Sequence, residues 1–166
     1  GKSGSCAISY GATSIKAYAF YKCSIITDIT IPNSVKVIAD NAFVSCSGLT
    51  GVIIPGSVTS IGRASFDTCN NLTMFNVDES NTVYKSIDGV LFSKDGTVLL
   101  NCPQGKSGSI AIPNGVTSIG ECGFYCCSKL KSISIPNSVT SIGDSAFALC
   151  WNLTNITIPS GVKSIE

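Results

Sequence analysis

A repeat of 23 residues is the feature of this sequence that most constrains its fold. The dipeptide Ile-Pro occurs five times, and three of the four gaps between its copies are 23 residues long. The remaining gap of 58 residues divides into 23 and 35, because Val77 stands where the next isoleucine is expected. The fourth unit, residues 77–111, is therefore longer than the others. The units begin at Ile8, Ile31, Ile54, Val77, Ile112, Ile135 and Ile158.

Apolar residues recur at fixed offsets within these units. The aromatic column is the clearest, and it contains Phe20, Phe43, Phe66, Phe124 and Phe147. A single short unit cannot bury its own apolar side chains, whereas stacked units place each column against its copies. We therefore predict that residues 1–166 form one solenoid of about seven 23-residue units, with a 35-residue unit at 77–111.

Each unit is predicted to contain a strand and a return segment. Residues 130–135 read L-x-x-L-x-L, the strand segment of a leucine-rich repeat, and their last three residues alternate inward and outward as in a half-buried strand. Residues 139–142 are rich in β-forming residues and predict a second, small strand on the opposite side. Residues 144–150 predict a single short helical or 3₁₀ turn.

The composition excludes several functional classes. Eleven Lys and Arg residues against ten Asp and Glu residues give a net charge of +1, and nucleic-acid binding needs clustered basic residues. The absence of histidine excludes Ser-His-Asp catalysis and His-ligated zinc within this chain. No apolar run is long enough for a membrane-spanning helix. No pair of carboxylates in a predicted cleft indicates an enzyme.

The long unit carries two Asp-Gly pairs, Asp88-Gly89 and Asp95-Gly96, each between β-forming residues. Asp-Gly favours tight hairpin turns, which need a positive φ. We predict a small antiparallel meander with strands at 83–87, 90–92 and 97–100. It is either a recognition loop or an insertion that packs its own apolar residues, and the second interpretation is favoured.

The units at residues 31–49 and 135–153 share an Ile-Pro-Asn-Ser-Val start, an Ala-Phe pair and a cysteine. They closely resemble the BspA-like, or treponemal-type, leucine-rich repeat family, and residues 84–96 resemble a longer repeat variant of it. The resemblance implies a right-handed α/β repeat solenoid with a parallel sheet on the concave side. It also implies short strands and 3₁₀ or helical turns on the return side, with a small β-hairpin insertion in the longer repeat.

The same resemblance implies a role. It points to surface-exposed or secreted proteins of anaerobic bacteria or protozoan parasites, which adhere to host matrix proteins such as fibronectin and fibrinogen, to host cells or to other microbes. No catalytic residues and no cofactor carry over. The expected function is a non-enzymatic, extracellular adhesion or protein-binding module. The alternatives are a structural spacer of a surface protein and, less favoured, a cysteine-based metal or redox protein.

Nine cysteines need a structural or a chemical explanation. Five recur in one column, where neighbours would lie about 4.8 Å apart with parallel Cβ directions that disfavour disulfides. We predict a ladder of reduced, structural thiols made of Cys23, Cys46, Cys69, Cys127 and Cys150. Four cysteines lie outside the column, namely Cys6, Cys102, Cys122 and Cys126. The run C-x₃-C-C at 122–127 lacks the second ligand pair of a zinc site, so no metal site is predicted. A disulfide involving Cys102, Cys122 or Cys126 is left open.

The candidate binding residues lie on the strand face that points away from the core. Stacked repeats make extended binding surfaces, and this one is a nearly uncharged, hydrogen-bonding strip with an apolar spot at Ile53 and Met74. The candidates are Asp28, Thr30, Gly51, Ile53, Met74, Asn76, Ser132, Ser134, Asn155 and Thr157. For each single residue a merely solvated strand is the preferred explanation, because strands favour Thr and Ser by propensity.

Residues 1–8 nearly copy residues 105–112, the end of the long unit. The chain is therefore expected to begin inside one repeat and to stop inside another, as a fragment of a longer protein, so that a missing signal peptide says nothing about location. Open solenoid ends expose apolar columns and unpaired edges, which predicts a tendency to self-associate.

Overall fold

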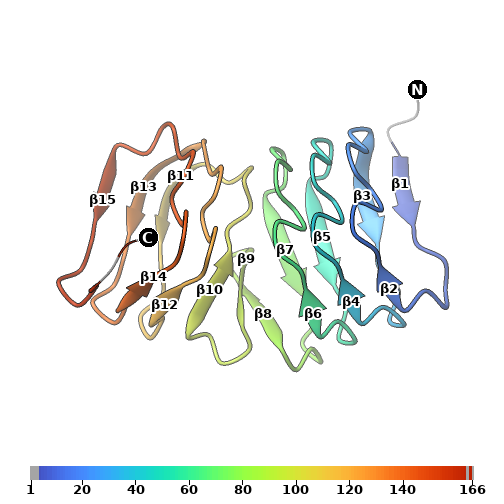
Figure 1. The fold of residues 1–166 in the computed structure, drawn as a ribbon, viewed down its shortest axis with the longest axis horizontal. Coiled ribbons are helices and arrows are strands. Elements are labelled where there is room, and N and C mark those ends of the chain that lie inside the picture. Colours follow the sequence, from blue (N-terminus) through green and yellow to red (C-terminus); the bar gives the residue numbers. More distant parts are fainter. Residues whose placement is uncertain (1–3, 164, 166) are drawn as a thin grey trace.

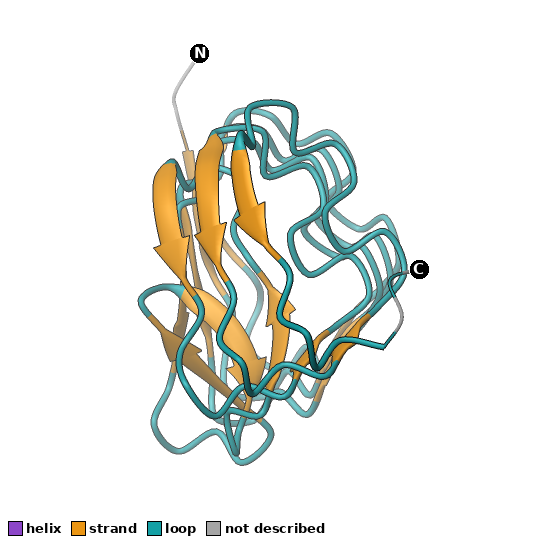
Figure 2. Cartoon of the chain, turned by 90° about the vertical axis from the view of Figure 1, so that its left-hand side faces the viewer, coloured by secondary structure: helices purple, strands orange, loops and turns teal. Residues whose placement is uncertain are grey.

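The computed structural model describes residues 4–163 and residue 165. The chain winds as an elongated stack of turns, with the first strands at one end and the last at the other (Figure 1). Seen along the stack, the longer strands line one side and the loops of successive turns lie over one another on the other side (Figure 2). The repeat periodicity therefore corresponds to one turn of a solenoid.

The longer strands form two parallel sheets. The first contains β1 (Gly4–Ala7), β3 (Ile26–Thr30), β5 (Gly51–Ile54) and β7 (Met74–Val77). The second contains β11 (Gly108–Ala111), β13 (Leu130–Ser134) and β15 (Asn155–Thr157). Paired residues are one unit apart, as in Val52 with Phe75 and Ile133 with Ile156. The prediction of a parallel sheet is confirmed within each half, but a single continuous sheet was wrong, because β7 and β11 do not pair.

Short strands form a second side of the stack. The first half has β2 (Ser14–Ile15), β4 (Val37–Ile38) and β6 (Ser60–Ile61). The second half has a five-stranded sheet in the order β14 (Ser141–Ile142), β12 (Ser118–Ile119), β10 (Val98–Asn101), β9 (Val90–Ser93) and β8 (Tyr84–Ile87). The last three strands are the predicted meander. Because β10 pairs in parallel with β12, the meander is built into the stack as part of its fourth turn.

The first hairpin turn follows from its sequence. Ile87 of β8 faces Val90 of β9 across the two residues Asp88 and Gly89. Both turn residues have a positive φ, 49° and 77°, which is the backbone of the type I′ turn that Asp-Gly favours. Asp-Gly therefore fixes the register of the β8–β9 pair.

Asn81 holds the base of this insertion. Its side chain is fully buried, and its Nδ2 donates to the carbonyl oxygens of Pro55 and Val58 at 2.8 and 2.9 Å. Its Oδ1 accepts from the N–H groups of Val83 and Tyr84 at 2.9 and 2.8 Å. One buried amide thus joins the third turn to the start of β8.

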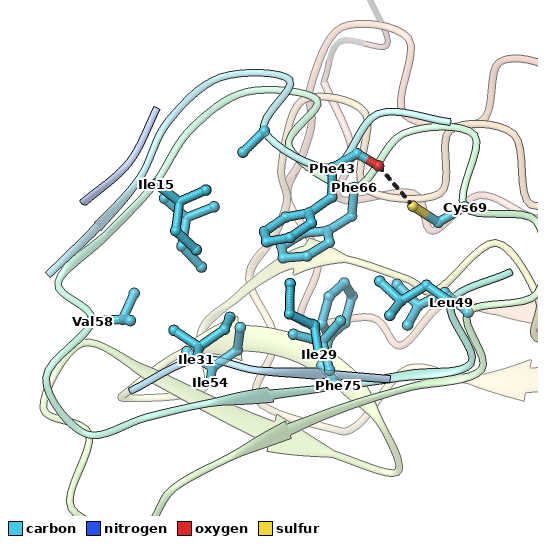
Figure 3. Packing of buried hydrophobic residues seen from close by; sticks show 14 of the residues in the cluster. Ile15, Ile29, Ile31, Phe43, Leu49, Ile54, Val58, Phe66, Cys69 and Phe75 are labelled. Atoms are coloured by element: carbon cyan, nitrogen blue, oxygen red, sulfur yellow. Dashed lines mark hydrogen bonds between the residues drawn. The ribbon is translucent and has the colours of Figure 1, made fainter. Parts of the chain in front are cut away.

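The core is made of the predicted columns. Phe43 is buried and its ring stacks between those of Phe20 and Phe66, with centroids 4.9 and 5.1 Å away. Figure 3 shows the stacked rings of Phe43 and Phe66. Phe124 and Phe147 stack in the same way at 5.5 Å. These rings fill the stack between the strand side and the return side, so the aromatic column is confirmed in both halves.

The return side contains turns, and the predicted helical or 3₁₀ segment was wrong. No helix occurs in residues 4–163. Over 144–150, the N–H groups of Ala146 and Ala148 each bond to the carbonyl three residues earlier, but Ser145 and Leu149 have φ values of 52° and 61°. A left-handed residue at every fourth position interrupts the right-handed winding that a helix needs. Main-chain N–H groups of such turns donate instead to carbonyl oxygens of the next repeat.

The long unit closes two hydrogen-bond ladders of the first half. On the strand side, the β7 N–H of Phe75 donates to Gly89 O at 2.9 Å and that of Val77 to Ser86 Oγ at 3.2 Å. On the second side, the β6 N–H of Ile61 donates to Tyr84 Oη at 3.0 Å. The insertion therefore satisfies edges that a regular repeat would have extended.

Candidate protein-binding face

The outward residues of β3, β5 and β7 form the first candidate face. Asp28, Gly51 and Met74 lie side by side across the three strands, and Ile53 pairs with Asn76. Their strands enclose a shallow, open hollow of about 390 Å³. Asp28, Thr30, Ile53, Met74 and Asn76 are exposed, and Gly51 is partly covered. The structure thus brings all six N-terminal candidates together.

The apolar spot on this face consists of Ile53 and Met74, whose side chains are 60% and 52% exposed. Met74 lies beside Gly51, where an added Cβ would be 3.4 Å from Met74 Cγ. Gly51 therefore leaves room for the flexible thioether to lie across the sheet. An exposed methionine next to an exposed isoleucine is the kind of adaptable apolar contact that binding surfaces use.

A threonine ladder borders the face at the strand starts. Thr50 and Thr73 each donate from Oγ1 to the carbonyl of the residue one unit earlier, at 3.3 and 3.1 Å. Thr154 repeats this bond to Lys131 O at 3.2 Å in the second half. Because these hydroxyls already donate to main-chain carbonyl oxygens, the ladder stabilises the border of the face.

The second candidate face lies on β11, β13 and β15. Ser132 pairs with Asn155 and Ser134 with Thr157, and a hollow of about 540 Å³ covers them. The sequence-based prediction did not include two residues of this face, Ser109 and Ala111 of β11. The signal that could have found them is the near-copy of residues 105–112 at residues 1–8, which indicates a repeated segment. Ser132 Oγ donates to Ser109 Oγ at 2.7 Å. Only uncharged side chains line this hollow.

The two faces are separate. The predicted strip was continuous, but the β8–β9 hairpin lies between the two sheets where they would have met (Figure 1). The physical reason is that Gly89 and Ser86 occupy the β7 edge, so β11 has no strand to join. The ten candidate residues therefore divide into six on the first sheet and four on the second.

The cysteine column lies away from these faces, on the return side. Three of its thiols donate to a main-chain carbonyl of the preceding turn: Cys46 to Phe20 at 3.0 Å, Cys69 to Phe43 at 3.2 Å and Cys150 to Phe124 at 3.1 Å. All nine cysteines are free thiols, including Cys23, whose pKa is raised by burial. The thiols thus act as hydrogen-bond donors between turns.

Cys102 was placed outside the column, but the structure sets it against Cys127. Cys127 Sγ donates to Cys102 O at 3.5 Å, and the contact between the two thiols, together with burial, raises the pKa of Cys127. The return turn of the long unit has a different length from the others, so constant spacing could not align Cys102 with the column.

Within residues 4–163 and 165, no three Cys, Asp or Glu side chains are grouped so that they could hold a metal ion. The same residues contain no helix that could cross a membrane.

The chain matches the family model described as the BspA type leucine-rich repeat region, in six copies over residues 3–96 and 99–166. No curated protein matches it. Among solved structures, it resembles the pneumococcal vaccine antigen PcpA with a TM-score of 0.86 and 29% identity, over 95% of this chain and 40% of that one. It also resembles a leucine-rich cell surface protein from Faecalibacterium prausnitzii A2-165, with a TM-score of 0.79 and 31% identity over 98% and 49%.

A leucine-rich repeat protein from Eubacterium ventriosum is similar as well, with a TM-score of 0.65 and 25% identity over 86% of this chain and 50% of that one. The chain spans half the length of these three proteins or less. The six matched copies cover nearly all of the sequence, and the stacked turns and columns are those of a leucine-rich repeat solenoid. The chain belongs to the BspA-type leucine-rich repeat family.

Proposed function

We propose that the chain is a non-enzymatic protein-binding module of a bacterial cell-surface protein, which contacts its partner through the two outward sheet faces. The observation that carries this proposal is the exposed pair Ile53 and Met74 in a nearly uncharged hollow. A merely solvated sheet face gains nothing from two large apolar side chains in water, whereas a binding surface gains affinity from burying them.

The mechanism is shallow contact at two places. Each hollow is shallow and open to solvent, so neither encloses a small molecule as a catalytic cleft would. A partner that touches both faces binds the second one as an intramolecular step, which raises the total affinity without new contacts. Repetition and buried area therefore supply the binding energy.

The relatives support a location outside the cell. One similar structure is a pneumococcal vaccine antigen and another is a leucine-rich cell surface protein. On this basis we propose extracellular or cell-surface placement, with host matrix proteins such as fibronectin or fibrinogen, or host or microbial cell surfaces, as partners. A purely structural spacer is the competing function.

The test compares three double variants for binding to immobilised fibronectin and fibrinogen. Ile53→Glu with Met74→Glu changes the first face, and Ser132→Glu with Ser134→Glu changes the second. Thr59→Glu with Thr140→Glu places the same charges on exposed positions directly before the short strands β6 and β14 and serves as the matched control. We expect the first pair to weaken binding by about tenfold or more and the control to bind normally.

If folded variants of both faces bind as well as the unmodified chain, the faces are not the binding surface. If function in cells is lost when units are deleted but not when the faces are changed, the spacer is the correct function.

A further inference from the structure

The ladder of turns on the return side is interrupted at the long unit. In the second unit, three N–H groups donate to carbonyl oxygens of the third unit at 2.8–3.0 Å; they belong to Asn41, Phe43 and Ser45. The fifth unit repeats the pattern toward the sixth through Cys122, Phe124 and Cys126. The corresponding N–H groups of the third unit belong to Ala64, Phe66 and Thr68. Within residues 4–163 and 165, these three have no hydrogen-bond acceptor.

The cause is the short return turn of the fourth unit. Gly108 lies nine positions after Leu99, whereas their pairing partners Ile119 and Leu130 lie eleven positions apart. The shortened turn donates from Cys102 N to Gly123 O of the fifth unit but places no carbonyl against the third. One layer of the ladder is therefore missing on the side of the third unit.

A notch of about 200 Å³ occupies this position. Residues 63–67 form one wall, Glu121 and Cys122 form the opposite wall, and Phe66, Leu91 and Leu100 contribute apolar surface. Two steps of about 4.8 Å separate the third and fifth turns, which is the room that one additional main-chain segment needs. The notch is thus a slot lined by both apolar and charged residues, with unpaired donors along one wall.

The long unit closes the other two ladders of the first half, but not this one. Gly89 and Ser86 accept from the β7 edge, and Tyr84 accepts from the β6 edge. Buried main-chain donors are almost always paired in folded proteins. An edge that is left open, beside two that are closed, is therefore suited to an external acceptor.

The charges of the notch indicate what that acceptor is. Arg63 Nη2 lies 2.7 Å from Glu121 Oε1 across the mouth, and both side chains are well exposed, so the ion pair is weak and can open. Asp67 adds a second carboxyl, whose pKa burial raises. Two carboxyl groups against one guanidinium disfavour a carboxylate or phosphate ligand. Neutral carbonyl oxygens, which accept from the regular ladder elsewhere, fit better.

We propose that this notch binds an extended peptide segment of a partner protein, whose main-chain carbonyls accept from Ala64 and Phe66 and whose apolar side chain packs on Leu100. The peptide takes the place of the missing layer, in the manner of strand addition at an open sheet edge. A basic residue beside the apolar one pairs with Asp67. The notch lies on the return side, so the proposal is independent of the function assigned to the strand faces.

Amide exchange tests the open ladder first. The N–H groups of Ala64 and Phe66 should exchange with solvent deuterium at least about a hundredfold faster than those of Phe43 and Phe124, which are bonded across turns. If Phe66 is protected as strongly as Phe43, the ladder is closed in solution and the proposal is wrong.

Peptide binding is then measured by titration of the ¹⁵N-labelled chain with capped pentapeptides, acetyl-AALAA-amide, acetyl-AKLAA-amide and acetyl-AELAA-amide. We expect saturable shifts at the amides of Ala64, Phe66 and Thr68, with the lysine peptide two- to fivefold tighter than the glutamate peptide. Shifts on β3, β5 and β7 instead, or equal shifts with sodium acetate alone, would overturn the proposal.

Two variants locate the peptide. Leu100→Trp fills the floor of the notch and should weaken binding by about tenfold. Glu121→Lys changes an exposed residue that the core does not need, and should reverse the order of the lysine and glutamate peptides. If the order is unchanged in folded Glu121→Lys protein, the peptide does not lie in the notch, whether or not the Leu100 variant folds.

Discussion

The sulfur of Cys69 lies 3.2 Å from the carbonyl oxygen of Phe43 in the preceding turn (Figure 3). The same carbonyl also accepts from the N–H of Cys46 at 3.1 Å. The thiol therefore satisfies the second lone pair of a buried oxygen, at a position with space for only a small side chain. This bond gives the cysteine column a structural purpose that needs no disulfide or metal.

Replacing that donor should destabilise the fold. Cys69→Ala leaves the Phe43 carbonyl half-satisfied in a dry core and creates a small cavity, so we expect a loss of about 2–3 kcal/mol in the free energy of unfolding. Cys126 is partly exposed, and its thiol donates no hydrogen bond to the described residues. Cys126→Ala is therefore the matched control and should cost less than about 1 kcal/mol in urea denaturation. Equal losses for both variants would contradict the role of the thiol bond.

Alkaline pH should weaken the fold through the same column. Burial raises the pKa of Cys150 from 9.0 to about 11. Contact with Cys102 and burial raise the pKa of Cys127 further. Below pH 9 both states keep these thiols protonated, whereas above it only the unfolded chain ionises them. The free energy of unfolding should therefore fall as pH rises from 9 to 11, by about 1.4 kcal/mol per pH unit for each fully buried thiol.

Cys150→Ser removes one ionisable group with a raised pKa and should make this pH slope shallower, whatever its effect at pH 7. Urea denaturation at pH 8, 9, 10 and 11 measures the slope of this variant and of the unmodified chain. A parallel fall in the two proteins would show that Cys150 does not contribute.

Asn81→Ala should be among the most destabilising single changes. The buried amide makes four hydrogen bonds to the main chain, and its removal leaves two carbonyls and two N–H groups without partners. We expect a loss of about 3–5 kcal/mol, measured by thermal or urea denaturation. Asn152, which is exposed and makes one side-chain bond, to Ser128 O at 2.7 Å, provides a control whose change to Ala should cost about 1 kcal/mol or less.

Asn81→Asp gives a distinct pH signature. A carboxylate cannot donate to Pro55 and Val58, and their carbonyl oxygens together with burial raise the pKa of the introduced group above its unfolded value. The variant should therefore be most stable below about pH 4 and lose stability as pH rises. A variant that gains stability with pH would contradict the bonding assigned to Asn81.

The aromatic column predicts a positional gradient. Phe43 is buried and stacked on both faces, so Phe43→Ala should cost about 3–5 kcal/mol. Phe147 stacks on Phe124 alone and is partly exposed, so the same substitution there should cost clearly less, about 1–3 kcal/mol. Denaturation of the two variants side by side measures the difference, and similar costs would argue against stacking as the source of core stability.

The buried columns were predictable because they depend on spacing alone. Phe43 and Phe66 recur at the same offset, and only a stack of equal turns buries both. The hairpin at Asp88-Gly89 was also predictable, because those two residues adopt positive φ with little cost. Both features are decided by local sequence or by strict periodicity.

The return turns were not predictable in the same way. Ala64 and Leu149 adopt positive φ without being glycine or asparagine, and a residue of this kind normally avoids that region. The carbonyl oxygens on either side of Ala64, those of Arg63 and Ser65, accept from N–H groups of the preceding turn and stabilise the conformation. A single unit of sequence carries no sign of these bonds. The helical expectation for 144–150 failed for this reason.

The division of the candidate face depended on tertiary structure too. Nothing in residues 84–90 taken alone shows that Ser86 and Gly89 accept hydrogen bonds from β7. The sequence placed Ile53 and Met74 on one outward face, as the strand alternation requires. It did not show that Ser132 and Ser134 would lie on a separate sheet.

The closed edge of β7 also bears on how such a protein changes over generations. Because the pairing stops there and starts again at β11, a duplication or deletion of one unit in either arm leaves the pairing of the other arm as it was. The long unit thus separates two stacks of repeats whose lengths can change independently. In evolution, one stack can gain or lose units while the binding face of the other stack stays unchanged.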